Sequence, residues 1–268
     1  MLIKYGMENC KEYDSPLQPG TILYPNEDRI DFPYKEWLGS LMHLRHTRPD
    51  IFYAINQLSR VAHAPGKEAV EAIKRVFGYL KRTIDIQLIF RHCKMEDMKL
   101  SALTDADWAS NKVDRKSVGG HIVYLGPSMI SASSRVQQVV STSTQAAEVV
   151  EIFRVSKKID WIKRLYEELP FVSNNDNAVV ITDSSAAVKA IAKLTEGNKH
   201  LGVYLCYLRQ LVKDKIISCH HVSREYNTAD IMTKQDTIKR FKYLKEEMFE
   251  EFRIEYVDYD PLRPPTDL

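Results

Sequence analysis

The order in which two hydrophobic periodicities follow one another constrains this chain most. Three short runs of β-type composition lie between residues 98 and 134, and turn residues join them: "MKLSALTD", "GGHIVYLG" and "MISASS". A long helical pattern follows over residues 144–169. After it come a strand "AVVITD", a helix over residues 184–194, a helix "VYLCYLRQLVKD", a strand "IISCHHV" and a helix that opens near Asn227. Three β runs followed by alternating elements predict an α/β layer with a mixed sheet.

Two further regions precede this pattern. Residues 1–33 have little apolar periodicity and several turn formers, which predicts an extended, wrapping segment: Pro16, Pro19, Gly20, Pro25 and Pro33. Residues 34–83 contain three helical patterns. We therefore expect a wrapping segment at 1–33, a helical region at 34–95, the α/β domain at 96–236, and a C-terminal helix with an acidic tail at 237–268.

Composition excludes some classes of protein. The chain has 268 residues, of which 44% are hydrophobic, so it can bury a core. No apolar run reaches the roughly 20 residues of a membrane span, and the first residues lack the apolar region of a secretory signal. We expect an intracellular protein, cytoplasmic or nuclear, with no membrane partner. The net charge is only +2, so a nucleic-acid role would depend on where the charges lie.

Carboxylates stand where predicted strands and helices begin or end. "LTD" closes one strand with Asp105 and "ITD" closes another with Asp183, so the two acids meet if the strands are neighbours. Glu148 lies in the first turns of the long helix and Asp230 follows "HHVSREYNTA", positions from which an acid can face a sheet end. Like charges a few ångströms apart raise one another's pKa, and a divalent cation relieves them. Carboxylate ligands favour Mg²⁺ or Mn²⁺.

The first of these strands also permits a simpler interpretation. Asp107 shares a strand face with Asp105, because side chains alternate along a strand. Taken alone, "LTDADWASNKVDRKS" fits a solvent-facing edge strand that ends in an Asx turn better than it fits a metal site. We favour Asp105 over Asp107 as a ligand, because the order apolar residue, Thr, Asp recurs at Asp183.

Eight segments, taken in order, resemble one protein family. They are "IKYGMENCK", "LGSLMHLRHTRPDIFYAINQLSR", "PGKEAVEAIKRVFGYLKRT", "TDADWASNKVDRKSVGGHIVYLG", "WIKRLYEEL", "ITDSSAAVKAIAK", "NKH" and "TADIMTK". As a set, they resemble the C-terminal end of the reverse transcriptase and the ribonuclease H domain of a Copia-type retrotransposon polyprotein. The resemblance implies a ribonuclease H-like mixed five-stranded sheet flanked by helices. The helical region before it would be a remnant of the reverse transcriptase thumb and connection.

The resemblance also implies an activity. The family cleaves the RNA strand of RNA–DNA hybrids with two Mg²⁺ ions, for which Mn²⁺ can substitute. By resemblance, Asp105 would contact both ions, Glu148 and Asp183 one of them, and Asp230 the other. DNA polymerase activity is not expected, and the partners would be the hybrid and the remaining reverse transcriptase domains of a longer polyprotein. The alternative is a catalytically impaired nucleic-acid-binding or protein-interaction module, because the family's His-Ile-Asp reads "HLG" over residues 200–202.

The acid on the long helix depends on the register of the comparison. The family has Ser-Thr-Glu-Ala-Glu-Tyr here, whereas this chain has "STSTQAAEVVEI". Counting from Ser143 puts Ala147 in the catalytic position, but counting back thirteen residues from Trp161 gives Glu148. A residue inserted within a helix rotates its buried face, whereas one inserted before the helix does not. We therefore expect Glu148, with Glu151 one turn later as the reserve candidate.

Three other features have competing interpretations. Lys67, Lys74 and Lys81 recur every seven residues and would bind phosphates by their place in the family, although a solvated helix face explains them equally well. His220 and His221 are adjacent on a predicted strand and face opposite ways, which argues against a shared metal site. "YVDYD" resembles the polymerase Tyr-x-Asp-Asp motif but has a Tyr between its acids. It lies in an acidic tail that should avoid nucleic acid.

Overall fold

A computed structural model describes residues 1–26, 30–110, 114–169, 176–193 and 201–249. The described chain forms two compact units, one of residues 1–89 and 234–249 and the other of residues 90–233. The tail from residue 250 onward, with "YVDYD", and the "NKH" segment lie outside the described residues.

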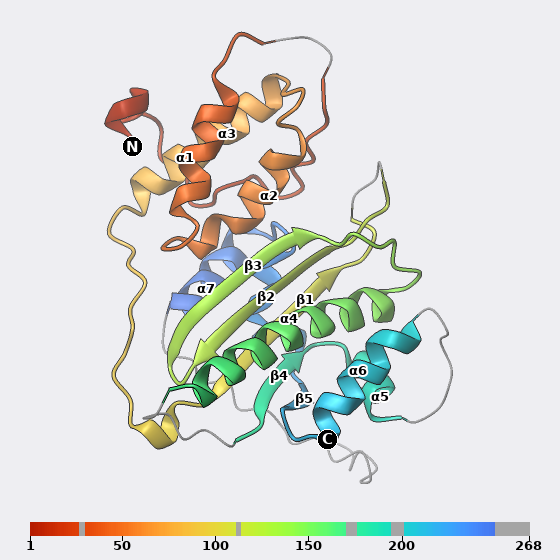
Figure 1. The fold of residues 1–268 in the computed structure, drawn as a ribbon. Helices are drawn as coiled ribbons and strands as arrows, with labels where there is room; N and C mark the ends of the chain where they lie inside the picture. Colours follow the sequence, from red (N-terminus) through yellow and green to blue (C-terminus); the bar gives the residue numbers. More distant parts are fainter. Residues whose placement is uncertain (27–29, 111–113, 170–175, 194–200, 250–268) are drawn as a thin grey trace. The chain divides into compact units, whose positions relative to one another are not determined.

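The first unit is helical. Its helices are α1 (Tyr34–Leu44), α2 (Phe52–Arg60), α3 (Lys67–Arg82) and α7 (Ile238–Phe249) (Figure 1). The first three confirm the three helical patterns of the sequence. On α3, the apolar residues Ile73 and Phe77 are fully buried, whereas Lys67 and Lys74 are exposed. The N-terminal segment packs on this helix at Gly78. A Cβ at this position would lie only 2.2 Å from the Lys11 carbonyl oxygen.

The second unit is built on the predicted mixed sheet. Its strands are β1 (Leu100–Asp107), β2 (Val118–Leu125), β3 (Ser128–Val136), β4 (Ala178–Thr182) and β5 (Ile217–His221). Within the described residues, they form a five-stranded sheet in the order β3-β2-β1-β4-β5. The β1-β2-β3 meander is antiparallel, whereas β4 runs parallel to both β1 and β5. The predicted α/β layer with a mixed sheet is therefore confirmed.

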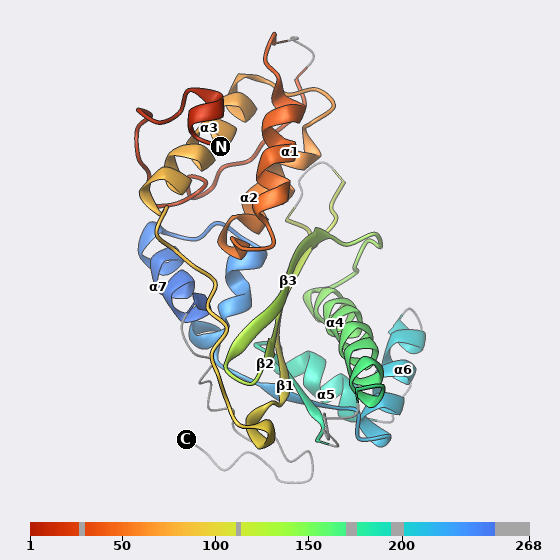
Figure 2. The same ribbon diagram turned by 60° about the vertical axis from the view of Figure 1, so that its left-hand side comes forward.

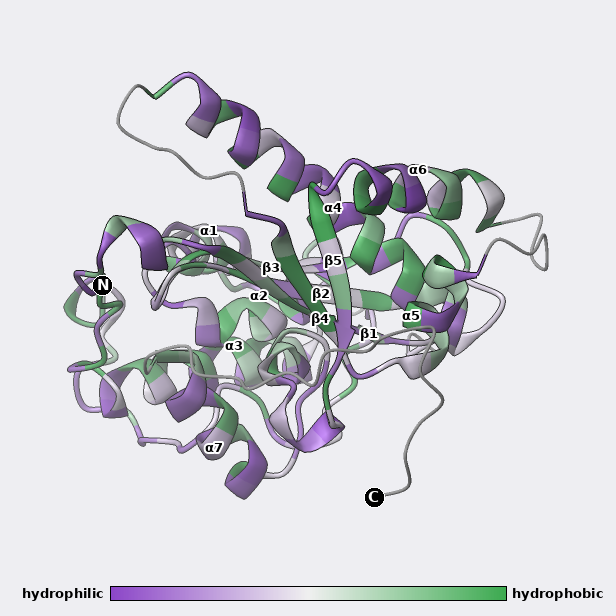
Figure 3. Cartoon of the chain, turned by 90° about the horizontal axis from the view of Figure 1, so that it is seen from below, coloured by the Kyte–Doolittle hydropathy of each residue, from purple (hydrophilic) through white to green (hydrophobic). Residues whose placement is uncertain are grey.

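The helices α4 (Thr144–Glu167), α5 (Ser185–Ala192) and α6 (Gly202–Lys213) share one hydrophobic core with the sheet. That core joins Ala102 of β1 and Val180 of β4 to Ile152 of α4 and Leu208 of α6. Figure 2 shows α4 and α6 on the same side of the sheet. Figure 3 shows hydrophobic residues concentrated in the strands, while the exposed turns of α4 are hydrophilic.

The helix that the sequence predicts near Asn227 is a short 3₁₀ helix and not an α-helix. It is η6 (Thr228–Met232), and the next α-helix is α7. Side chains hold both ends of η6 on β1. The Asn227 amide donates a hydrogen bond to the Thr104 carbonyl oxygen at 2.9 Å, and the Thr233 hydroxyl donates to the Asp105 carboxylate. The few residues between these anchors form the tighter helix that suits short segments.

Adjacent glycines in β2 allow close packing on both faces of the sheet. A Cβ at Gly119 would lie 2.0 Å from the Glu151 carboxylate on α4. A Cβ at Gly120 would lie 2.4 Å from the Met232 Cβ of η6. Gly120 is also the residue of β2 that pairs with Asp105.

Alanine substitution measures this packing. We expect Gly119→Ala and Gly120→Ala each to lower the free energy of unfolding by about 1–3 kcal/mol, because a neighbour must shift. Gly39→Ala on α1 is the control, since a Cβ there meets nothing within 4 Å. In a helix this change should instead stabilise by roughly 0.5–1 kcal/mol. Urea unfolding provides the measurement, and Gly120→Ala with unchanged stability would contradict the close approach of η6.

Candidate metal centre

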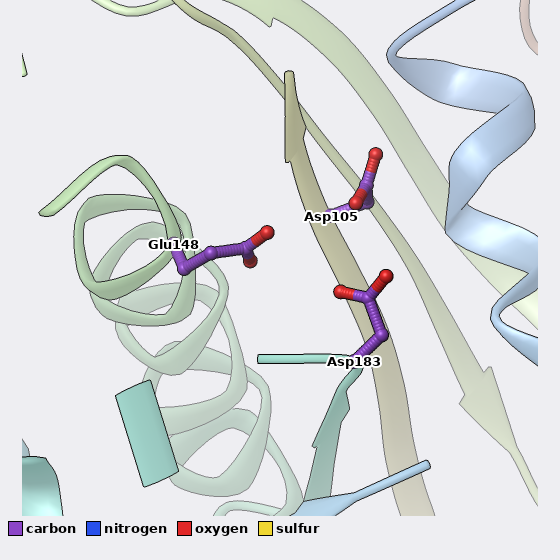
Figure 4. A group of neighbouring side chains, drawn as sticks. All are labelled: Asp105, Glu148 and Asp183. Carbon is purple, nitrogen blue, oxygen red and sulfur yellow. The ribbon is translucent and has the colours of Figure 1, made fainter. Parts of the chain in front are cut away.

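Three carboxylates from three elements converge at one end of the sheet. Asp105 lies on β1, Asp183 directly follows β4, and Glu148 lies on α4. Each offers one carboxylate oxygen, and these three atoms all lie within 4.8 Å of one another. Figure 4 shows Glu148 reaching from α4 toward the two aspartates. Among the described residues, this acidic group has the composition and spacing of a cation site.

The pairing of β1 with β4 brings the two aspartates together. Thr104 pairs with Thr182 across the parallel strands, so Asp105 within β1 and Asp183 just after β4 lie at the same end of this strand pair. The condition on which the two acids meet, that their strands are neighbours, is therefore fulfilled. Of the three strands of the meander, β1 is the one that borders β4.

Glu148 is fixed by the start of its helix and by two hydrogen bonds. The Ser143 hydroxyl caps α4 by accepting from the Ala146 amide at 3.1 Å, and Glu148 follows in the second turn. One Glu148 oxygen accepts from the Ala106 amide and the other from the Thr182 hydroxyl, each at 3.3 Å. Both donors come from the strands that carry the aspartates, so the sheet itself orients the helix residue.

The acidic group affects the titration of Glu148. Burial raises the pKa of Glu148 well above its ordinary value, and the negative charges of Asp105 and Asp183 raise it further. The hydrogen bonds from Ala106 and Thr182 act in the opposite direction but are smaller effects. A divalent cation would reverse this situation, because it favours the ionised form of each acid. The residues present therefore fit a hard divalent cation with oxygen ligands.

Glu151 faces a different environment from Glu148. It is fully buried, and its two oxygens lie 2.7 Å from Nδ1 of His121 and 2.7 Å from Nη1 of Arg154. Glu151 thus binds a histidine of β2 and an arginine of its own helix, and only Glu148 joins the two aspartates. Of the two glutamates considered from the sequence, the structure places Glu148 in the acidic group.

The fourth predicted acid lies close by but is not one of the three converging residues. Asp230 belongs to η6, is 1% exposed, and its carboxylate lies 3.8 Å from Nε of Arg224. The segment of Asp230 contacts Asp105 through Thr233, whose hydroxyl donates a hydrogen bond to the Asp105 carboxylate. The Thr233 backbone amide donates to the Asp230 carbonyl oxygen at 3.2 Å. Metal binding by Asp230 remains a prediction.

The structure adds two threonines that the sequence analysis did not single out. Thr182 donates to Glu148 and accepts from the Ser184 amide, and Thr233 donates to Asp105. Both stand in segments quoted for the family resemblance, "ITDSSAAVKAIAK" and "TADIMTK". The carboxylates that they bind, Glu148 and Asp105, are distant in the sequence, so position within a motif was the only signal.

The three lysines of α3 do not share one environment. Lys67 and Lys74 are exposed, and the Lys74 ammonium lies 5.4 Å from the centre of the Phe32 ring. The Lys81 ammonium donates to the Cys10 carbonyl oxygen at 3.0 Å and lies 3.6 Å from the Glu12 carboxylate. Phosphate binding by these lysines remains a prediction, which the structure restricts mainly to Lys67 and Lys74.

Salt dependence tests that prediction. If both exposed lysines bind phosphates, replacing Lys67 and Lys74 together by Gln should flatten the slope of log affinity against log salt by roughly 2, since each contact contributes about 0.9. Lys81→Gln should change the slope less, because its ammonium already has partners within the protein. The measurement is hybrid binding across a salt series. An unchanged slope in the folded double variant would make this a solvated helix face.

Sequence comparison identifies relatives. The chain is 33% identical over 239 residues, 87% of its length, to the retrovirus-related Pol polyprotein from transposon RE1 of Arabidopsis thaliana. It is 31% identical over 258 residues, 92% of its length, to the corresponding polyprotein from transposon TNT 1-94 of Nicotiana tabacum. The chain is a homologue of the Pol polyproteins of Copia-type retrotransposons. This Pol homologue spans only 16% and 19% of the length of those two relatives. No family model matches its sequence.

Solved structures give a further comparison. LC11-RNase H1, isolated from compost, matches 51% of the Pol homologue and 93% of its own chain, with a TM-score of 0.40 and 16% identity. A foamy viral protease-reverse transcriptase in complex with double-stranded DNA matches 72% of the Pol homologue and 33% of its own chain, with a TM-score of 0.45 and 13% identity. The second unit is a mixed five-stranded sheet flanked by helices, the arrangement that the family resemblance implied. None of the helices described in the structure is both long and apolar enough to cross a membrane.

Proposed function

We propose that the Pol homologue is a ribonuclease H that cleaves the RNA strand of RNA–DNA hybrids with the help of divalent cations. The observation that carries the proposal is the convergence of Asp105, Glu148 and Asp183 on a ribonuclease H-like sheet. Homology to retrovirus-related Pol polyproteins of transposons supports the same activity, which the family resemblance implies.

In the proposed site, the protein supplies ligands and geometry. Asp105, Glu148 and Asp183 would hold Mg²⁺, or Mn²⁺ in its place, and Asp230 would complete a two-ion site from η6. Bound divalent cations supply an activated water and stabilise the leaving 3′ oxygen. The Ala106 amide and the Thr182 hydroxyl orient Glu148 before any cation binds, and Asp105 and Glu148 are both buried.

Incubation with a labelled hybrid tests the proposal. We expect the purified chain to shorten the RNA strand in Mg²⁺ or Mn²⁺, to leave the DNA strand intact, and to stop when EDTA is added. Duplex RNA of the same sequence should remain intact, and a primed template with deoxynucleotides should show no extension. Binding of the hybrid without cleavage in either metal would instead support a catalytically impaired nucleic-acid-binding module.

A further inference from the structure

The Thr233 side chain connects the acidic group to the segment that carries Asp230. Thr233 is fully buried, and its hydroxyl lies within hydrogen-bonding distance of two acceptors. One acceptor is Oδ2 of Asp105, and the other is the backbone carbonyl oxygen of Asp230, 3.2 Å away. The first belongs to β1 and the second to η6, so this one hydroxyl faces both halves of the proposed cation site.

A hydroxyl has only one proton, so Thr233 can donate to only one of these acceptors at a time. Hydrogen bonds to an ionised carboxylate are roughly twice as strong as those between neutral groups. An uncoordinated Asp105 carboxylate therefore attracts the proton. That bond holds Oδ2 of Asp105 in one orientation, so the carboxylate needs less ordering to act as a cation ligand. Because the same hydroxyl lies 3.2 Å from the Asp230 carbonyl oxygen, a shift of η6 would also shift Oδ2.

Other contacts hold both ends of η6 against β1 and β2. Asn227 holds its first turn, since the side-chain amide donates to the Thr104 carbonyl oxygen and the side-chain oxygen accepts from the Ala229 amide at 3.2 Å. At its other end, Met232 and Thr233 press on the bare backbone of Gly120, the pairing partner of Asp105. The Thr233 hydroxyl is therefore held between β1 and η6.

We propose that Thr233 is a positioning residue that fixes Oδ2 of Asp105 and couples cation binding in the acidic group to the η6 segment carrying Asp230. The proposal rests on the proposed function for the presence of a cation, but not for cleavage. It predicts that cation affinity depends on the Thr233 hydroxyl, and that the effects of Thr233 and Asp230 on that affinity are not independent.

Two substitutions separate the hydroxyl from the volume of the side chain. Thr233→Val keeps the shape and removes the proton, whereas Thr233→Ser keeps the proton. We expect Thr233→Val to weaken Mn²⁺ binding, measured by calorimetry, about 10–100-fold, the range for residues that orient metal ligands. Thr233→Ser should stay within about threefold of the parent chain, because it retains the hydrogen bond. Unfolding in EDTA provides the folding control for both variants.

A double-variant cycle tests the coupling. Asp230→Asn and Thr233→Val, each alone, should weaken Mn²⁺ binding, and together they should weaken it less than the product of the two single effects. Equal Mn²⁺ affinity of Thr233→Val and the parent chain, a simple product in the double variant, or no Mn²⁺ binding by the parent chain would each overturn the proposal.

These outcomes are distinguishable from failure of the proposed function. A chain that fails to cleave the hybrid but whose Mn²⁺ affinity falls in Thr233→Val would retain the coupling without the activity. A chain that cleaves the hybrid and has unaltered Mn²⁺ affinity in Thr233→Val would retain the activity without the coupling.

Discussion

Asp105→Asn and Asp183→Asn should each reduce hybrid cleavage to the level of a buffer blank, whereas Asp107→Asn should leave most of it. An amide presents one oxygen and no negative charge, so it is a poor replacement for a carboxylate that must hold a divalent cation. Asp107 is the matched control because it lies two residues from Asp105 on the same strand and is not one of the three converging acids. The measurement is the initial rate on a labelled hybrid at saturating Mg²⁺.

Cation-induced stabilisation gives a second readout of the same variants. The parent chain should unfold at a higher temperature in Mn²⁺ than in EDTA, because a ligand that binds only the folded state stabilises it. Both inactive variants should lose most of this difference. Full activity in either Asp105→Asn or Asp183→Asn would exclude the acidic group as the catalytic site.

Glu148→Gln and Glu151→Gln should change stability in opposite directions, although they lie one turn apart on α4. In EDTA, Glu148→Gln removes a buried charge that faces Asp105 and Asp183, so the variant should be more stable than the parent chain. Each kcal/mol gained should raise the melting temperature by roughly 2–4 °C. Glu151→Gln removes the charge that pairs with Arg154 and should cost about 1–3 kcal/mol.

The same two variants should also differ in hybrid cleavage. Glu148→Gln should abolish cleavage because it removes a proposed ligand, while Glu151→Gln, if folded, should retain most of it. The assay therefore needs a temperature at which both variants are folded, established first by circular dichroism. Abolished cleavage in a folded Glu151→Gln together with normal cleavage in Glu148→Gln would reverse the assignment of the two glutamates.

The stability difference at Glu148 should depend on pH. Because the folded state raises the pKa of Glu148, the folded state holds this proton more tightly than the unfolded state does. The associated stability is fully present below the ordinary glutamate pKa and is lost as pH rises through the raised value. In EDTA, the advantage of Glu148→Gln over the parent chain should therefore be small at pH 4 and grow toward neutral pH, as thermal melts can measure. An advantage that is constant with pH would mean that the charge of Glu148 does not oppose folding.

The sheet and the carboxylate-bearing strands could be predicted from the sequence because their signals are local. Short runs of β-type composition mark the strands, and the order apolar residue, Thr, Asp recurs, inside β1 and at the end of β4. The interval from Trp161 to Glu148 could be counted without knowing the fold, since a helix preserves the spacing of its own residues. These local signals do not show whether β1 and β4 are neighbours. The family resemblance implied that arrangement.

The contacts of η6 could not be predicted in this way. Thr233 meets Asp105 across 128 residues of sequence, and Asn227 meets Thr104 across 123. No periodicity connects residues so far apart, and the short segment between the two anchors has too few residues to show whether it forms an α or a 3₁₀ helix. The partners of Lys81 in the N-terminal segment were hidden for the same reason.

The two glycines of β2 have different prospects under mutation. At position 119, the obstacle to a larger residue is the end of a flexible side chain, the Glu151 carboxylate. A shorter residue at 151 could therefore make room, and a second-site suppressor of Gly119→Ala should be recoverable there. At position 120, the nearest atoms include the Cβ and the main chain of Met232, which no ordinary side-chain exchange removes. During evolution, Gly119 can thus be replaced in two substitutions, at positions 151 and 119. Replacement of Gly120 requires a shift of η6, the segment that carries Asp230.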